Sequence, residues 1–292
     1  MKYESVELND QVRKTLPGEF IQLKEGFVHY EIEGPVEGEV VILVHGFSAP
    51  SFVWDHNFPF LVRNGCRVLR YDLYGRGYSD RPESKYNMEL YVRQLHELVQ
   101  RLGLTKKKVN LVGLSMGGGI CVILAEKYPN LVRRISLIDP MGFSVGGLTN
   151  EIFYRMVKVP GLSSLLMKLL RHDFFVNSQK NDFVQYEGFE EYLEEYRKQM
   201  YYKGFLRAIW STIQNIPFTN LRETYEIVGK RLPMQLFWGE KDRTIPFQAS
   251  EKVLDAVPSI KFFPIKNAGH QPQYTHSSEV NPLLLEFIIS DI

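Results

Sequence analysis

A serine flanked by glycines is the group in this sequence best suited to covalent chemistry. Residues 113–117 read Gly-Leu-Ser-Met-Gly and fit the G-x-S-x-G pattern. This pattern works when a sharp strand-to-helix turn exposes the serine hydroxyl at the carboxyl edge of a sheet, with small neighbours that let strand and helix approach closely. A buried-strand run at 108–112 leads into Ser115, and a helix-like run at 118–124 follows it. We therefore predict that Ser115 is a nucleophile.

A second match to the same pattern occurs at residues 142–146, around Ser144. It follows a proline, and glycines at 142, 146 and 147 surround the serine. We interpret Ser144 as part of a glycine-rich lead into the next segment.

A serine hydroxyl needs a base that removes its proton during attack. Among the seven histidines, His270 follows a strand-like run at 260–265 on a short loop with Gly269, which frees the imidazole to project over a sheet edge. We predict that His270 is the base. The other histidines are interpreted as surface, packing or loop residues: His29, His45, His56, His96, His172 and His276.

An acid must orient that imidazole and stabilise its protonated form. Asp242 follows the strand-like run at 234–238 through a glycine turn, which gives the chain order Ser, Asp, His. Asp139, at the end of the run 135–138, is the competing candidate, and Glu240 is the nearest neighbour of similar chemistry. We favour Asp242 and interpret Glu240 as solvent-facing.

The elements that position these groups alternate between strands and helices. Apolar runs on successive residues fit strands covered on both faces, and the intervening helical patterns predict a mostly parallel sheet with helices on both faces. A hairpin is expected at 20–23 and 27–32, strands at 40–44, 67–71, 109–112, 135–138, 234–238 and 260–263, and helices at 88–102, 117–128, 250–256 and from 280 onward.

The alternation stops between residues 142 and 226, where the sequence is helix-like and rich in aromatic residues. We predict a helical cap over 142–226, inserted into a core domain formed by 1–141 and 227–292. Such an insert fits a lid over a site and equally an ordinary helical subdomain with its own core.

Composition excludes several classes of protein. The 292 residues carry 35 Lys+Arg and 34 Asp+Glu, a net charge of +1, which argues against nucleic acid as the main partner. No run approaches the ~20 apolar residues of a membrane span, and the N-terminus lacks the apolar stretch of a secretory signal. The two cysteines, Cys66 and Cys121, lie in apolar runs and are expected to be buried free thiols. We expect a cytoplasmic protein without a metal site.

Four further motifs, in the same order along the chain, resemble those of the α/β-hydrolase family. They are His45-Gly46-Phe47 after the first buried strand, a D-x-x-G-x-G-x-S turn at 72–79, Trp238 to Asp242, and Asn267 to His270. The resemblance extends from about residue 20 to the C-terminus. It implies a sheet of about eight strands with a cap after the sixth strand. It also implies an oxyanion hole built from the backbone N–H groups of Phe47 and Met116, and structural roles for Asp72 and Asp80.

The resemblance points to hydrolysis of carboxylic esters through an acyl-enzyme on Ser115, since haloalkane dehalogenases and epoxide hydrolases of this fold use a carboxylate as the nucleophile at this position. The aromatic insert suggests a small or lipid-like ester with an apolar acyl or alcohol group. The Ser-Met-Gly-Gly sequence from Ser115 also resembles carbon–carbon bond hydrolases of ring-cleavage dienoates. A small-molecule receptor with an intact triad is the third alternative. No cofactor is expected, because no G-x-G-x-x-G follows the first buried strand. The sequence does not indicate an oligomeric state.

Overall fold

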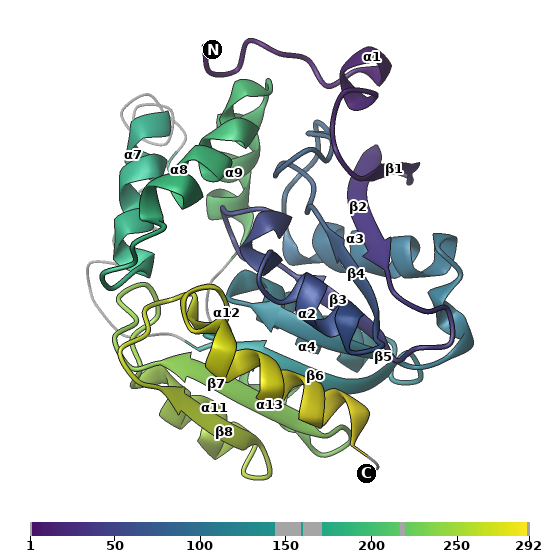
Figure 1. Cartoon of the computed structure of the whole chain (residues 1–292), viewed down its shortest axis with the longest axis vertical. Helices are drawn as coiled ribbons and strands as arrows, with labels where there is room; N and C mark the ends of the chain where they lie inside the picture. The colour runs from purple at the N-terminus through teal and green to yellow at the C-terminus, as the bar shows by residue number, and fades with distance from the viewer. Residues whose placement is uncertain (1, 144–158, 160–170, 217–219, 291–292) are drawn as a thin grey trace.

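An eight-stranded sheet forms the centre of the molecule (Figure 1). The computed structural model describes residues 2–143, 159, 171–216 and 220–290. The strand order is β1-β2-β4-β3-β5-β6-β7-β8. Strand β2 pairs antiparallel with β1 and β4, and all other neighbours pair parallel. The strands are β1 (Glu19–Gln22), β2 (Phe27–Glu33), β3 (Val40–Val44), β4 (Arg67–Tyr71), β5 (Val109–Leu114), β6 (Val132–Ile138), β7 (Met234–Gly239) and β8 (Lys261–Ile265). The predicted fold class is confirmed.

Helices cover both faces of this sheet, as the continuous apolar strands require. Every residue of β3, β5 and β7 is buried. On one face they pack against α3 (Met88–Arg101), α4 (Met116–Lys127), α10 (Arg222–Gly229) and α11 (Ala249–Ala256). On the other face they pack against α2 (Phe58–Arg63) and α13 (Ser277–Ile289), which lie in front in Figure 1. Strands buried on both faces gain most of their stability from this covering rather than from local propensity.

The remaining helices are short or belong to the segment between β6 and β7. Outside that segment they are α1 (Asp10–Arg13), η1 (Ser51–Trp54), η2 (Leu104–Lys106) and α12 (Pro272–Thr275). Within it lie α7 (His172–Ser178), η3 (Gln179–Asp182), α8 (Phe189–Lys198), η4 (Gln199–Tyr201) and α9 (Phe205–Asn215). Figure 1 shows α7, α8 and α9 as a group beyond one end of the strands. A helical cap therefore follows the sixth strand, as predicted.

The aromatic residues of the cap are mostly packed inside the protein. Tyr192, Tyr196 and Phe205 are fully buried, and they belong to a core cluster that also includes sheet residues such as Leu43. Phe174 is an exception, with 48% of its surface exposed. The division at 142–226 stays a prediction, since much of 144–170 lies outside the described residues. Helix α10 begins before residue 226 and packs against the core helices α4 and α11.

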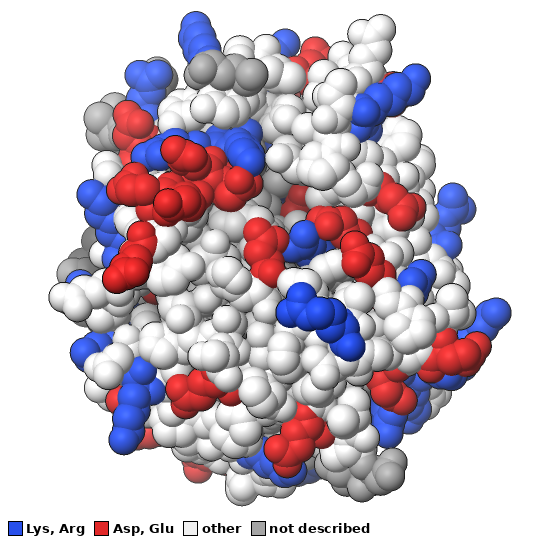
Figure 2. All heavy atoms as spheres, viewed as in Figure 1, with Lys and Arg blue, Asp and Glu red and all other residues white. Residues whose placement is uncertain are grey.

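Both cysteines are buried free thiols, as expected. Within the described ranges, no helix combines the length and apolar character needed to cross a membrane. Figure 2 shows that charges of both signs are spread over one face, and that acidic side chains gather over α8. That helix carries exposed glutamates at 190, 191 and 194.

Candidate active site

Ser115 occupies a sharp turn between β5 and α4. Its backbone has φ 53° and ψ −118°, outside the regions that most residues prefer, and α4 begins at the next residue, Met116. The Ser115 N–H donates to the carbonyl of Ile138 at the end of β6 (2.9 Å), and its own carbonyl accepts from the N–H groups of Gly118 and Met141. Backbone strain that the surrounding hydrogen bonds hold in place is a frequent property of functional sites. The expected strand-to-helix turn is present, and its serine is half-buried.

Two glycines allow the chain to close around this turn. A Cβ at Gly117 would lie 2.6 Å from the carbonyl oxygen of His45 and closer still to that of Val44. A Cβ at Gly46 would lie 3.2 Å from the Ser115 Cβ and 3.8 Å from its Oγ. The loop after β3 therefore packs directly against the serine. Ser144, the serine of the second G-x-S-x-G match, lies outside the described residues.

Gly117→Ala should lower the free energy of unfolding by about 3 kcal/mol or more, because the new methyl group meets backbone atoms of β3 that cannot rotate away. Urea denaturation measures the loss. Gly103→Ala is the matched control. Gly103 has nothing within 4 Å of an added Cβ, and its positive φ of 67° alone should cost about 1 kcal/mol. Equal losses in the two variants would contradict the close approach at Gly117.

The structure brings Asp242 and His270 into direct contact. His270 Nδ1 lies 2.7 Å from Asp242 Oδ2, and both side chains are buried. The other carboxylate oxygen of Asp242 accepts from the backbone N–H groups of Thr244 (2.7 Å) and Ile245 (2.9 Å). Asp242 therefore orients the ring through Nδ1, which leaves Nε2 for chemistry. Glu240 is exposed, as expected.

The surroundings of His270 favour its protonated form. Burial lowers the pKa of the imidazole, but the charge and hydrogen bond of Asp242, followed by the charge of Asp182, raise the pKa to about 10. One carboxylate oxygen each of Asp139 and Asp242 and one ring nitrogen of His270 lie within 4.8 Å of one another. A buried imidazolium beside carboxylates is stabilised by their charge.

Ser115 and the three residues Asp139, Asp242 and His270 each follow one of four neighbouring strands, at the same edge of the sheet. Ser115 follows β5, Asp139 follows β6, Asp242 follows β7 and His270 follows β8. Because β5 to β8 run parallel, their carboxyl ends meet at the same edge. The strand pairing shows that these ends are level with one another, since Leu114 pairs with Ile138 and Ile138 pairs with Phe237.

His45 fixes the loop after β3 through two hydrogen bonds of its ring. This histidine is fully buried, and its Nε2 accepts from the Leu73 N–H (2.9 Å), so its Nδ1 carries the hydrogen and donates to the Gly46 carbonyl (2.9 Å). Burial lowers the pKa of His45 to about 4. The ring therefore stays neutral at physiological pH and serves as a fixed structural link.

Arg76 joins the same loop to the cap. Its guanidinium is completely buried and donates to the Phe47 carbonyl (2.7 Å), the Tyr91 hydroxyl (3.0 Å) and the Thr212 hydroxyl of α9 (2.9 Å). No carboxylate forms an ion pair with it among the described residues. Arg76 thus connects the candidate oxyanion loop and the cap through neutral oxygen atoms.

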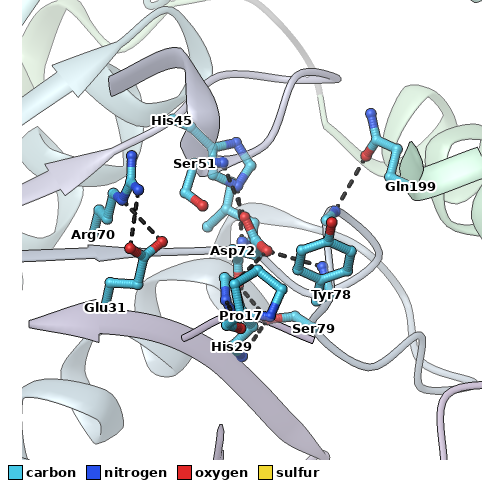
Figure 3. A network of polar contacts seen from close by, with 12 residues as sticks. Pro17, His29, Glu31, His45, Ser51, Arg70, Asp72, Tyr78, Ser79 and Gln199 are labelled. Carbon is cyan, nitrogen blue, oxygen red and sulfur yellow. Dashed lines mark hydrogen bonds and ion pairs between the residues drawn. The ribbon is translucent and has the colours of Figure 1, made fainter. Parts of the chain in front are cut away.

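Asp72 binds the end of the loop after β3, at Ser51, as Figure 3 shows. Its Oδ1 accepts from the Ser51 N–H (2.9 Å), and its Oδ2 accepts from His29 Nδ1 (2.8 Å) and the Tyr78 N–H (2.8 Å). Burial favours the neutral acid, but the charge and hydrogen bond of His29 hold the pKa of Asp72 well below its ordinary value. Burial alone would lower the pKa of His29, but the negative charge of Asp72 outweighs the effect of burial. The pKa of His29 is therefore raised. Asp72 has the structural role that the resemblance implies.

The sequence comparison agrees with this geometry. The model of the alpha/beta hydrolase fold family matches residues 39–277, most of the chain and all of the strands from β3 to β8. The chain belongs to the α/β-hydrolase fold family. Lipase 1 of Psychrobacter immobilis is 29% identical to this α/β-hydrolase over 250 residues, which cover 83% of this chain and 74% of the lipase.

A second relative is named as a hydrolase, and a similar solved structure as an esterase. A 2-hydroxy-6-oxononadienedioate/2-hydroxy-6-oxononatrienedioate hydrolase of Pseudomonas sp is 24% identical over 283 residues, 92% of this α/β-hydrolase and 95% of the relative. The structure of an esterase from Exiguobacterium antarcticum matches with a TM-score of 0.79 at 19% identity, covering 94% of this chain and all of the esterase. At that identity the likeness shows the fold alone.

Residues of the cap contact the histidine loop in a way that no sequence motif indicates. The backbone carbonyl of Asp182 in η3 accepts from the His270 N–H (2.9 Å), and its side chain accepts from the Thr244 hydroxyl (2.6 Å) and from Gln271 (3.2 Å). Gln271 also donates to the Tyr192 hydroxyl of α8 (2.7 Å). The cap therefore helps to place His270 in this α/β-hydrolase.

A separate cavity of about 210 Å³ lies between α8 and η1 and does not include the predicted site residues. Its walls carry the Arg70–Glu31 ion pair (2.9 Å), and Arg70 also binds Asp55. Figure 2 shows acidic and basic side chains close together near the middle of this face. Because these charges are already paired with one another, we do not assign the catalytic chemistry of this α/β-hydrolase to this cavity.

Proposed function

We propose that the protein is a serine hydrolase that cleaves carboxylic esters through an acyl-enzyme. The observation that carries this proposal is the His270–Asp242 contact of 2.7 Å at the sheet edge where the strained Ser115 turn also lies. Acyl transfer by serine requires a nucleophile, a base and an orienting acid, and Ser, Asp, His is their chain order in the α/β-hydrolase fold.

In the proposed reaction the Ser115 Oγ attacks the ester carbonyl while His270 Nε2 takes the hydroxyl proton. The tetrahedral intermediate expels the alcohol, which receives that proton from His270, and the acyl group remains bonded to Ser115. His270 then removes a proton from water as the water attacks the acyl carbon. The carboxylic acid leaves and the Ser115 hydroxyl is restored.

The negative oxygen of each intermediate needs hydrogen-bond donors that are already in place. We assign this role to the backbone N–H groups of Phe47 and Met116. Met116 is the first residue of α4, where N–H groups point toward a helix N-terminus. The packing of Gly46 against Ser115 brings the Phe47 loop to the same place.

Phe47→Pro should reduce kcat by about 100-fold or more, because proline has no N–H and losing one such donor costs about 3 kcal/mol. Phe47→Leu keeps the N–H and should lose less than tenfold. Steady-state hydrolysis of a p-nitrophenyl ester measures both variants. Similar losses in the two would count against a backbone donor at this position.

The proposed substrate is a small or lipid-like ester with an apolar acyl or alcohol group. The lipase relative supports a lipid-like ester. Tyr192, Tyr196 and Phe205 pack in the protein's own core, so the preference for an apolar group rests on the lipase relative and not on these cap aromatics.

Two measurements on the purified protein test the proposal. Labelling with a fluorophosphonate followed by peptide mass spectrometry should find the label on Ser115, and label on Ser144 would overturn the choice of nucleophile. A series of p-nitrophenyl esters of increasing acyl length should show turnover with a preferred length.

Cleavage of a carbon–carbon bond in ring-cleavage dienoates is the second candidate. The Pseudomonas relative, matched over nearly the whole length of both chains, favours it. A dienoate assayed beside the ester series separates the two functions. A kcat/KM for the dienoate that exceeds those of all the esters would replace the ester proposal with this one.

A further inference from the structure

Asp139 is a buried carboxyl group with an unusual set of partners. It follows β6 directly, its side chain is completely buried, and its backbone has a positive φ of 41°. One oxygen, Oδ1, accepts from the Gly239 N–H (2.9 Å). The other, Oδ2, is also buried and has no hydrogen-bond donor within the described part of the chain. A buried carboxylate oxygen without a donor is costly unless it carries a proton.

The neighbour that can accept such a proton is Asp242. Oxygen atoms of Asp139 and Asp242 lie within 4.8 Å of each other and of a His270 ring nitrogen. Two carboxylates this close do not both ionise readily in a buried site. Asp242 receives three hydrogen bonds, from Thr244, Ile245 and His270, whereas Asp139 receives one.

This difference in partners decides which of the two holds the proton. Hydrogen bonds to the charged form favour ionisation, so Asp242 is the carboxylate and Asp139 the neutral acid. In agreement, burial, followed by the charge of Asp242, raises the pKa of Asp139 well above its ordinary value.

We propose that Asp139 is a positioning residue that holds a proton against Asp242, and that it becomes the carboxylate partner of His270 when residue 242 carries no charge. This inference rests on the proposed function of Ser115, His270 and Asp242. The proton held by Asp139 completes the hydrogen bonds of both carboxyl groups. It also limits the negative charge beside His270 to that of Asp242 and the more distant Asp182.

The first test compares kcat/KM for a p-nitrophenyl ester in Asp139→Asn, Asp242→Asn and the double variant. An asparagine at 139 has the shape of the protonated acid and can donate to Asp242, so we expect a loss of about threefold or less in the presence of Asp242. Asp242→Asn should lower kcat/KM by only about 100-fold, because Asp139 then ionises and takes over part of the support of His270. The double variant should lose about 10⁴-fold, the effect of an amide in place of the orienting acid of a triad.

The decisive quantity is thus the loss of kcat/KM that Asp139→Asn causes in each background. We expect about threefold when Asp242 is present and roughly 100-fold when residue 242 is Asn. Asp182→Asn is the matched control, since it removes another nearby carboxylate, one that binds Thr244 and Gln271. Its cost should differ by less than threefold between the two backgrounds. Thermal unfolding monitored by circular dichroism shows whether each variant is folded.

The second test reads the state of His270 without turnover. In ¹⁵N-histidine-labelled Ser115→Ala protein, the signals that disappear in a His270→Gln sample belong to His270. We expect the pKa of His270 to stay above its ordinary value of about 6.5 in Asp242→Asn and to fall to or below that value in the double variant.

Two results would overturn the inference. One is a His270 pKa that falls as far in Asp242→Asn as in the double variant, with equal costs of Asp139→Asn in both backgrounds. The other is a response of the His270 titration to EDTA, which would place a divalent cation, and not a proton, between the carboxylates. If instead Ser115→Ala kept full esterase activity while the titrations behaved as expected, the proposed function would fail and the pairing of Asp139 with Asp242 would stand.

Discussion

Ser115→Ala should lower kcat for ester hydrolysis by roughly 10⁵-fold, because the acyl-enzyme cannot form without the hydroxyl. The residual rate would come from donors that stabilise the oxyanion during direct attack by water. KM should change little, since a half-buried serine hydroxyl contributes little to binding of the ground state. Stopped-flow or overnight assays with a p-nitrophenyl ester cover the required range of rates.

Ser144→Ala is the matched control for this loss, since it removes a hydroxyl from the other G-x-S-x-G sequence in the chain. It should retain wild-type kcat. Both variants should also keep the wild-type melting temperature within a few degrees. A Ser115→Ala protein that hydrolyses the ester at more than a tenth of the wild-type rate would exclude Ser115 as the nucleophile.

Ester hydrolysis should accelerate by about 100-fold between pH 7 and pH 9. A general base must be neutral, and the carboxylates around His270 raise its pKa to about 10. Below that pKa the neutral fraction grows about tenfold with each pH unit, so kcat/KM should rise with pH in the same proportion. A pH profile of kcat/KM, corrected for spontaneous hydrolysis of the ester, measures the rise.

A plateau of kcat/KM from pH 7 upward would contradict this expectation and would mean that His270 is neutral at physiological pH. Asp182→Asn provides an internal check, because the charge of Asp182 contributes to the raised pKa of His270. That variant should reach its maximal rate at a lower pH than the wild type. Circular dichroism at each pH separates loss of structure from titration of the base.

Local sequence patterns predicted most of the sheet and its helices. The helix expected at 88–102 spans Met88–Arg101, and the one expected at 117–128 spans Met116–Lys127. The first has its own start and stop signals, since the Asn87 side chain caps its N-terminus and Gly103 follows its end. The second is fixed by the glycines that the tight turn at Ser115 requires. Such signals are contained in a few consecutive residues.

The contact between Asp242 and His270 could be predicted for a related reason. Each residue follows a strand directly, and neighbouring parallel strands end at the same edge of a sheet. The role of Asp139 could not be decided in the same way, because Asp139 also follows a strand at that edge. Its partners are the Gly239 N–H at the end of β7 and Asp242 just after that strand, about 100 residues further along. Only the folded structure shows which oxygen has a donor.

Contacts between distant segments account for the rest of what the sequence did not indicate. The sequence indicates a surface or packing role for His29, and the structure buries it in an ion pair with Asp72, 43 residues further along, which no nearby residue indicates. Asp182 stands in a polar stretch of the insert with no motif around it, yet its carbonyl binds the His270 N–H. Neither partner can be identified from residues nearby in sequence.

The buried guanidinium of Arg76 has a consequence for how freely α9 can move. Because the same side chain binds Phe47 and Thr212, lifting α9 away from the sheet removes a partner from a cation that has no counter-ion among the described residues. Such a movement carries an energetic penalty, because a buried charged donor would lose a hydrogen bond. We therefore expect α9 to stay closed over Arg76, because each departure of Thr212 leaves a buried positive charge with one donor group unsatisfied.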